Sequence, residues 1–186
     1  MDDNDPQVEE YKKISIDRLR IHVGPGVGSA LALKALMKMC DSEWMKIGTD
    51  DIVYETPRWD EKMLAAMPKD RVGLVFTSDG LGNQCNHFLF HRKLFDLTGM
   101  WPDVFWHFGP DGYIGKVIEG VAMERRVFLK SVMIRHLQAK SHKAGWDLTF
   151  LEERKNGPGY EDMKRAMEFF DRDVGILKAE VERCKS

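Results

Sequence analysis

The spacing of apolar and polar residues predicts strands and helices that alternate along most of the chain. Residues 14–23 (ISIDRLRIHV) alternate between apolar and polar side chains, with a one-residue slip, which is typical of a strand. Residues 29–40 place apolar side chains on one face at helical spacing. Residues 71–78 contain a nearly continuous apolar run, which indicates a strand covered on both faces, as in parallel sheets.

The middle of the chain contains four further predicted elements. The apolar residues 85–99 predict a buried helix, and residues 102–108 predict a strand. The GPDG sequence at residues 109–112 is a turn signal, so residues 113–120 are expected to return as a hairpin strand. Residues 121–140 predict a long helix. Shorter elements are expected as strands at 44–47, 52–54 and 146–152 and as a helix at 58–67.

This alternation predicts an α/β fold, a layered Rossmann-like sheet that is mainly parallel with one antiparallel hairpin. Residues 1–13 are expected to be mobile or briefly helical, and residues 14–153 to form the α/β core. Residues 154–186 are expected to form a long C-terminal helix. Its apolar residues from Tyr160 to Cys184 recur at alternating spacings of three and four, which is a heptad pattern. This helix either docks on its own sheet or pairs with a protein partner or a second copy.

Composition narrows the class of protein. The 186 residues are 43% apolar and 31% charged, and the formal charge is −2, so binding to nucleic acid is not favoured. No apolar run approaches the ~20 residues of a membrane-spanning helix, and the polar N-terminus does not resemble a secretory signal. Three widely separated cysteines argue against a disulfide framework and for a reducing compartment. We therefore expect a cytoplasmic protein that does not interact with membranes.

A glycine-rich loop follows the first predicted strand. In HVGPGVGSA, three glycines precede Ser29, which is placed to cap the following helix, and Asp50 lies about twenty residues further on. The loop resembles motif I of S-adenosylmethionine-dependent methyltransferases, although that family usually has an acidic residue at the position of His22. The resemblance implies that Gly24, Gly26 and Gly28 approach a ligand closely and that Asp50 or Asp51 binds ribose hydroxyl groups. A tight strand-to-helix turn is the alternative explanation.

A second glycine turn follows the strand at residues 71–78. Asp79, Asn83 and Gln84 would lie at the carboxyl end of this strand, where open α/β sheets place ligands. The sequence GLGNQ resembles a turn of α-1,2-fucosyltransferases, and the resemblance implies a nucleotide-sugar site. It covers fewer than twenty residues. The matching residues are Gly80, Leu81, Gly82, Asn83 and Gln84.

His87 and His91 are four residues apart, so on a helix they would share a face. The sequence has no glutamate between them in an HExxH arrangement, and we predict partly buried, hydrogen-bonded histidines near the rim of the core, without a metal ion. His87 is the nearest acid–base candidate to the second turn.

Two functions follow from these observations. The first is a small protein that binds a nucleotide-like ligand where both loops open on one sheet edge, either S-adenosylmethionine or a nucleotide, and acts as a methyl or glycosyl transferase. The alternative is a non-catalytic structural or interaction subunit of a larger cellular or viral assembly, which contacts a partner or second copy through residues 160–184. The residues predicted for the first function are His87 and Asp79 for catalysis and Gly24, Gly26, Gly28, Ser29, Asp50, Asn83 and Gln84 for ligand binding.

Overall fold

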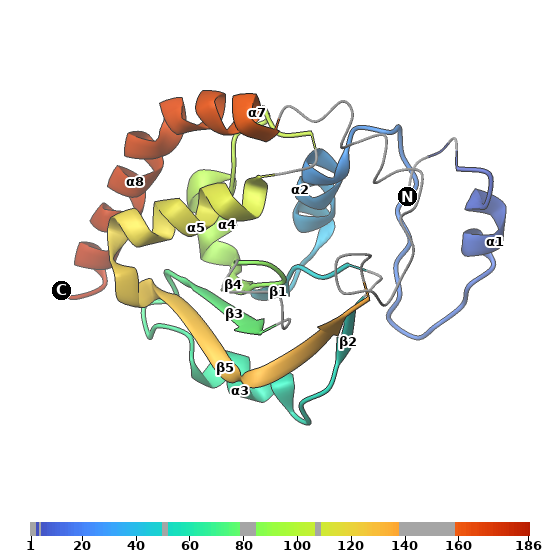
Figure 1. Cartoon of the computed structure of the whole chain (residues 1–186), viewed down its shortest axis with the longest axis horizontal. Coiled ribbons are helices and arrows are strands. Elements are labelled where there is room, and N and C mark those ends of the chain that lie inside the picture. The colour runs from blue at the N-terminus through green and yellow to red at the C-terminus, as the bar shows by residue number, and fades with distance from the viewer. Residues whose placement is uncertain (1–2, 4, 50–51, 79–84, 107–108, 138–158) are drawn as a thin grey trace.

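The computed structural model describes residues 3, 5–49, 52–78, 85–106, 109–137 and 159–186 (Figure 1). Five strands form one sheet in the order β1-β4-β3-β5-β2. In this order β1 and β2 are the two edge strands, and the sheet is curled into a half-barrel. The strands are β1 (Trp44–Lys46), β2 (Ile52–Tyr54), β3 (Leu74–Ser78), β4 (Leu89–His91) and β5 (Arg126–His136).

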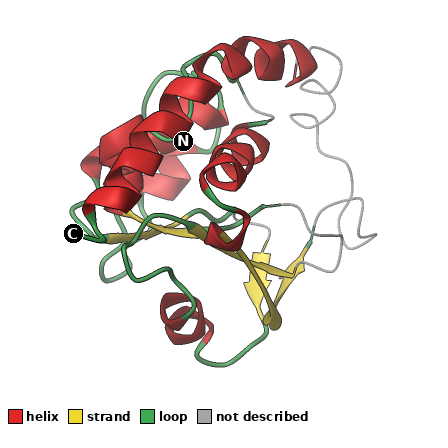
Figure 2. Cartoon of the chain, turned by 90° about the vertical axis from the view of Figure 1, so that its left-hand side faces the viewer, coloured by secondary structure: helices red, strands yellow, loops and turns green. Residues whose placement is uncertain are grey.

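Helices cover both faces of this sheet, most of them on one side (Figure 2). On the crowded side, α8 packs against α4 and α5, whereas α3 covers the opposite face against β3 and β5. The helices are α1 (Val8–Lys12), α2 (Ser29–Met39), α3 (Trp59–Ala65), α4 (Arg92–Thr98), α5 (Pro110–Val121), α7 (Gly159–Ala166) and α8 (Phe170–Arg183), with short 3-10 turns at η1 (Met123–Arg125) and η3 (Met167–Phe169).

Two apolar clusters lie on the two faces of the sheet because side chains alternate along each strand. Leu74 and Phe76 of β3 face the larger cluster, which includes residues of α2, α4, α5 and α8. Val75 faces the smaller cluster, which contains Met63 of α3 and Leu89 of β4. Helices on both sides therefore explain why the sequence of β3 is an uninterrupted apolar run.

The prediction of a mainly parallel Rossmann-like sheet is wrong. The pairs β1–β4, β3–β4 and β2–β5 are antiparallel, and the parallel pair is β3–β5. An apolar run shows that both faces of a strand are covered, but it does not report the direction of the neighbouring strands. The predicted elements at α2, α3, β1, β2 and β3 are confirmed close to their expected bounds.

The expected hairpin strand at residues 113–120 is helix α5. Gly109 caps the helix with φ 103°, and Pro110 occupies its first position, where a missing amide hydrogen does no harm. Tyr113, Ile114 and Val117 are buried at helical spacing. The Gly-Pro pair therefore marks a helix start rather than a hairpin turn.

Two other predicted helices are wrong wholly or in part. Residues 121–140 contain strand β5 instead of a helix, and in its second half Val132 and Ile134 are buried while Met133 and Arg135 are exposed. This two-residue period belongs to a strand. The predicted helix at residues 85–99 contains β4 at residues 89–91, and only its second half is helical.

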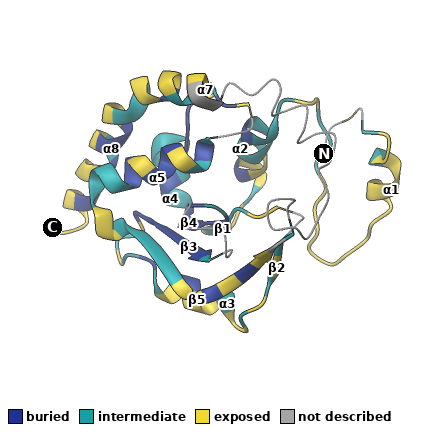
Figure 3. Cartoon of the chain, viewed as in Figure 1, coloured by how far each residue is buried: buried dark blue, intermediate teal, exposed yellow. Residues whose placement is uncertain are grey.

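The predicted strand at residues 14–23 is not formed. Its aliphatic side chains remain on the surface, with Ile16 63% and Leu19 47% exposed (Figure 3). No strand is present at residues 102–106 either, and the predicted strand at residues 146–152 lies outside the described residues. Alternation at residues 14–23 therefore does not produce sheet pairing within the described chain.

The C-terminal heptad pattern packs on its own domain. Val174, Leu177 and Val181 are buried in the larger cluster, whereas Cys184 is exposed. The helix is also interrupted, because the 3-10 turn η3 separates α7 from α8. The apolar positions of α8 thus contribute to the core of the domain.

Candidate functional site

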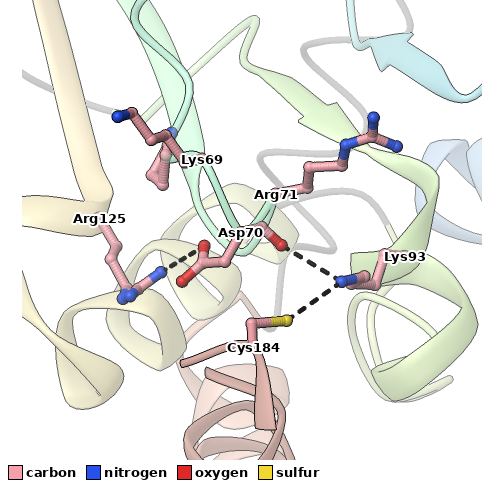
Figure 4. Close-up of a pocket in the computed structure, with 7 residues that line it drawn as sticks. Lys69, Asp70, Arg71, Lys93, Arg125 and Cys184 are labelled. Carbon is pink, nitrogen blue, oxygen red and sulfur yellow. Dashed lines mark hydrogen bonds and ion pairs between the residues drawn. The ribbon is translucent and has the colours of Figure 1, made fainter. Parts of the chain in front are cut away.

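A basic pocket of about 600 Å³ opens where four segments that are distant in the sequence meet (Figure 4). The segment between α3 and β3 contributes Lys69, Asp70 and Arg71 to its lining. Lys93 comes from the first turn of α4, and Arg125 comes from the end of η1. Pro68 and Cys184, the latter at the C-terminal cap of α8, complete the lining.

Asp70 holds the floor of the pocket in place. Its carboxylate accepts hydrogen bonds from Arg125 at 2.8 Å and from the Val72 amide at 3.1 Å, and its carbonyl accepts one from Lys93 at 3.2 Å (Figure 4). Burial alone would raise the pKa of Asp70, but these hydrogen bonds outweigh burial and hold the pKa below its usual range. Asp70 is therefore ionised at neutral pH and fixes two of the basic side chains.

Lys93 also joins the pocket to α8. Its ammonium nitrogen lies 2.8 Å from Glu180 Oε1 and 3.7 Å from Cys184 Sγ. The hydrogen bond to Glu180 raises the pKa of Lys93. In turn, hydrogen bonds from Arg183 and Lys93 lower the pKa of Glu180 to about 2. Lys93 thus stays charged and is held in position by the carboxylate of Glu180, which does not itself line the pocket.

Arg71 retains hydrogen-bonding capacity. Its Nη1 lies 3.1 Å from His91 Nε2, while His91 Nδ1 accepts a hydrogen bond from the Lys93 amide. A neutral imidazole has only one acceptor nitrogen. Because Nδ1 accepts from the Lys93 amide, the proton lies on Nε2, and Nε2 cannot accept a hydrogen bond from Arg71. Burial, together with the charge of Arg71, lowers the pKa of His91 and favours this neutral form. The ion pair from Arg71 to Glu43 is long, at 3.8 Å.

The pocket therefore carries an excess of positive charge. Four cationic side chains line it with one carboxylate, and Glu180 and Glu43 each pair with one of those cations from outside the lining. Lys69 and Arg71 are exposed and extend on opposite sides of Asp70 (Figure 4). Arg71 also has φ 65°, a left-handed conformation that is rare for a residue with a side chain. This arrangement suits an anion that reaches the pocket from solvent.

The predicted glycine loop leads into α2 without the strand that was expected before it. Residues 14–23 do not form a strand, and Ser29 is the first residue of α2 rather than its cap. The Ala30 amide at the start of α2 donates to the carbonyl oxygen of Trp106 at 3.1 Å. A Cβ on Gly28 would lie 2.4 Å from that same oxygen, so the close approach that requires this glycine is to Trp106. Gly24 and Gly26 lie in the segment that leads to this contact.

Most of the other predicted residues lie outside the described structure. Asp50, Asp79, Asn83 and Gln84 belong to this group, so the idea of a shared sheet edge stays a prediction. His87 is described and is 6% exposed, directly before β4, with φ 51°. It does not line the basic pocket.

The sequence offers only weak signals for the residues that form the pocket. Lys69 and Asp70 lie in a break between two predicted elements, and Arg125 belongs to the predicted helix at residues 121–140. Their proximity arises because η1 ends beside the start of β3, where Arg125 also donates to the Val72 carbonyl at 2.9 Å. This contact joins segments that are far apart in the sequence, so a pattern of neighbouring residues does not predict it.

No family model, curated protein or solved structure matches this chain significantly. Among the described residues, no helix has the length and apolar character to cross a membrane. Within the same residues, no group of three histidine, cysteine, aspartate or glutamate side chains is placed to bind a metal ion.

Proposed function

We propose that this protein binds a small phosphate-bearing ligand of the nucleotide-like class in the basic pocket. The observation that supports the proposal is the lining itself, in which the exposed Lys69 and Arg71 accompany the fixed cations Lys93 and Arg125 around one carboxylate. Arginine presents a planar fork of donors that matches phosphate oxygens, and lysine adds a mobile positive charge.

The size and chemistry of the pocket favour a polar ligand. Its volume lies in the range of small-molecule sites, but charged side chains dominate its lining. We therefore place the proposed ligand beside residues 68–71, which line this pocket, rather than at the glycine loop before α2. Methyl or glycosyl transfer stays a prediction, because the residues 79–84 on which it partly depends lie outside the described structure.

The alternative function, an interaction subunit that uses its C-terminal helix, has less support. Val174, Leu177 and Val181 of the heptad pattern are buried against the rest of the domain. A partner that bound those positions would have to displace α8 from α4 and α5. We therefore favour the small-ligand function.

Thermal unfolding in the presence of ADP, AMP, pyrophosphate and inorganic phosphate tests the proposal. A ligand that binds only the folded state stabilises it by about 2.7 kcal/mol at a concentration one hundred times its dissociation constant. We expect ADP to raise the melting temperature in a concentration-dependent way. Equal stabilisation by inorganic phosphate would show anion binding without recognition of the nucleoside, and a flat response to all four compounds would contradict the proposal.

A matched pair of arginine variants locates the effect. Arg71→Gln should remove most of the stabilisation by ADP. Arg18→Gln should leave it unchanged, because Arg18 has the same φ of 65° but a 92% exposed side chain away from the pocket lining. An equal response of the two variants to ADP would contradict the assignment of the site.

A further inference from the structure

Lys46 connects the two edges of the half-barrel. It is on the edge strand β1, and its ammonium nitrogen lies 5.0 Å from the ring centroid of Tyr54 on the other edge strand, β2. The same nitrogen lies 5.8 Å from the ring of Trp59 at the start of α3. Tyr54 and Trp59 stack on each other with centroids 3.8 Å apart, so they form one aromatic wall beside the lysine.

The polar contacts of the Lys46 nitrogen are to main-chain oxygens. It donates to the His87 carbonyl at 2.6 Å and to the Ile47 carbonyl at 3.1 Å. Among the described residues, no carboxylate lies within 4.0 Å of it. Burial without a neighbouring anion lowers the pKa of Lys46 to about 7. The uncharged form of this amine is therefore reached at a lower pH than in an ordinary lysine.

Lys46 shares the α3-covered face of the sheet with a second polar group. It pairs with Leu89, and Leu89 pairs with Val75, so these three residues form one row across that face. Thr77 is two residues beyond Val75 and has the same orientation. It is 3% exposed, and its hydroxyl group has no hydrogen-bond partner among the described residues. An orphaned hydroxyl group on this otherwise apolar face points to a ligand that supplies a polar atom.

We propose that Lys46 is a nucleophilic amine that forms an imine with a small aldehyde or ketone at the edge of the half-barrel. Lysines that react in this way are typically desolvated, and the rings of Tyr54 and Trp59 lie beside Nζ in place of water. The residue is partly exposed, so a small carbonyl compound can reach it from solvent. The site does not include any residue of the basic pocket, so this inference is independent of the proposed phosphate ligand.

The chemistry uses only the amine and the carbonyl compound. The lone pair of Lys46 Nζ attacks the carbonyl carbon, and the carbonyl π electrons move to oxygen to give a carbinolamine. The two hydrogens of the uncharged amine leave with that oxygen as water, and a carbon–nitrogen double bond forms. No electron acceptor or donor is required. The hydrogen bonds to the His87 and Ile47 carbonyls hold Nζ in place before the attack.

Reductive trapping of the full-length protein tests the inference. The protein is incubated at pH 7 with a low concentration of propanal and sodium cyanoborohydride, and modified lysines are identified by mass spectrometry of peptides. An ordinary lysine with a pKa near 10.4 is about one part in 2,500 uncharged at this pH, and the lowered pKa of Lys46 makes its uncharged fraction much larger. We expect Lys46 to be modified at least tenfold faster than the exposed Lys12 and Lys13.

Two controls keep the result interpretable. Lys46→Arg retains hydrogen-bond donors at this position but cannot form the imine, so the rapid phase of modification should disappear. Arg18→Gln, at a 92% exposed side chain outside the sheet, should leave the modification of Lys46 unchanged. The inference is overturned if Lys46 in the unaltered protein reacts no faster than Lys12 and Lys13, and that comparison does not depend on whether Lys46→Arg folds.

Discussion

The hydrogen bond between Tyr113 Oη and Asp173 Oδ2 joins α5 to α8 inside the larger core. It is 2.6 Å long, and the two residues are 0% and 1% exposed. Tyr113→Phe removes this donor from the buried carboxylate, which keeps its contacts to Arg172. We expect the free energy of unfolding, measured by urea denaturation, to fall by about 1–3 kcal/mol. Tyr11→Phe, at an exposed tyrosine, should change it by less than about 0.5 kcal/mol, and similar losses for both variants would contradict the assignment.

His91 makes stability depend on pH. Burial is the main reason that its pKa in the folded protein lies below the ordinary 6.5. The unfolded chain therefore binds a proton at His91 more readily than the folded protein does. As the pH falls below about 6.5, proton binding at His91 lowers the free energy of unfolding. Protonation also removes the acceptor Nδ1 that caps α4 through the Lys93 amide.

His91→Asn separates this effect from the other titrating groups, because asparagine keeps a capping oxygen but does not titrate. We expect the unfolding free energy of the unaltered protein to fall more steeply between pH 7 and pH 5 than that of the variant. Parallel pH profiles for the two proteins would show that His91 does not contribute.

Two helical glycines should respond oppositely to alanine. Gly175 in α8 has open space where the Cβ of an alanine would lie, so Gly175→Ala should stabilise the protein by about 0.4–1 kcal/mol through the lower entropy of the unfolded chain. Gly120 in α5 faces α8, and a Cβ there would lie 2.8 Å from Val174 Cγ2 and 2.9 Å from Phe170 Cζ. We expect Gly120→Ala to destabilise by about 1–3 kcal/mol. Thermal denaturation of both variants checks the pair, and stabilisation by both would contradict the packing of α5 against α8.

The secondary structure can be predicted from the sequence where one signal dominates. The strand β3 and the helix α2 lack competing turn signals, and their predicted bounds lie close to the observed ones. The region from Gly109 to His136 is predicted with its two elements reversed, because the Gly-Pro pair favours both a turn and a helix start. In β5 the alternation becomes clear only from Val132 onward, after a run of apolar residues that fits a helix equally well.

At the scale of the whole molecule, the segment before α2 adds little to stability. Ile14, Ile16, Leu19 and Ile21 are all at least 37% exposed, and the segment extends away from the layered body (Figure 3). Removal of residues 1–21 should therefore shift the melting temperature by less than about 2 °C, which corresponds to roughly 1 kcal/mol or less in a chain of this size. Removal of residues 170–186 should instead abolish cooperative unfolding, because it takes Val174, Leu177 and Val181 out of the core. Loss of cooperativity in the first truncation would contradict the fold.

The sheet order and the candidate site could not be predicted because both depend on contacts between distant segments. Lys93 and Glu180 are 87 residues apart in the sequence yet form an ion pair of 2.8 Å, and Arg125 reaches Asp70 across 55 residues. The glycine loop has a recognisable local pattern, but its close approach is to Trp106 of the same chain. A motif can thus be explained by packing, while a pocket forms from residues without any motif.

Chemical-shift mapping by two-dimensional ¹H–¹⁵N NMR during a titration with ADP tests most directly where the ligand binds. If the basic pocket is the site, the largest saturable shifts will occur at the amides of residues 69–72, Lys93 and Arg125. Shifts confined to residues 24–30 at the start of α2, or no saturable shifts at all, would contradict binding in the basic pocket.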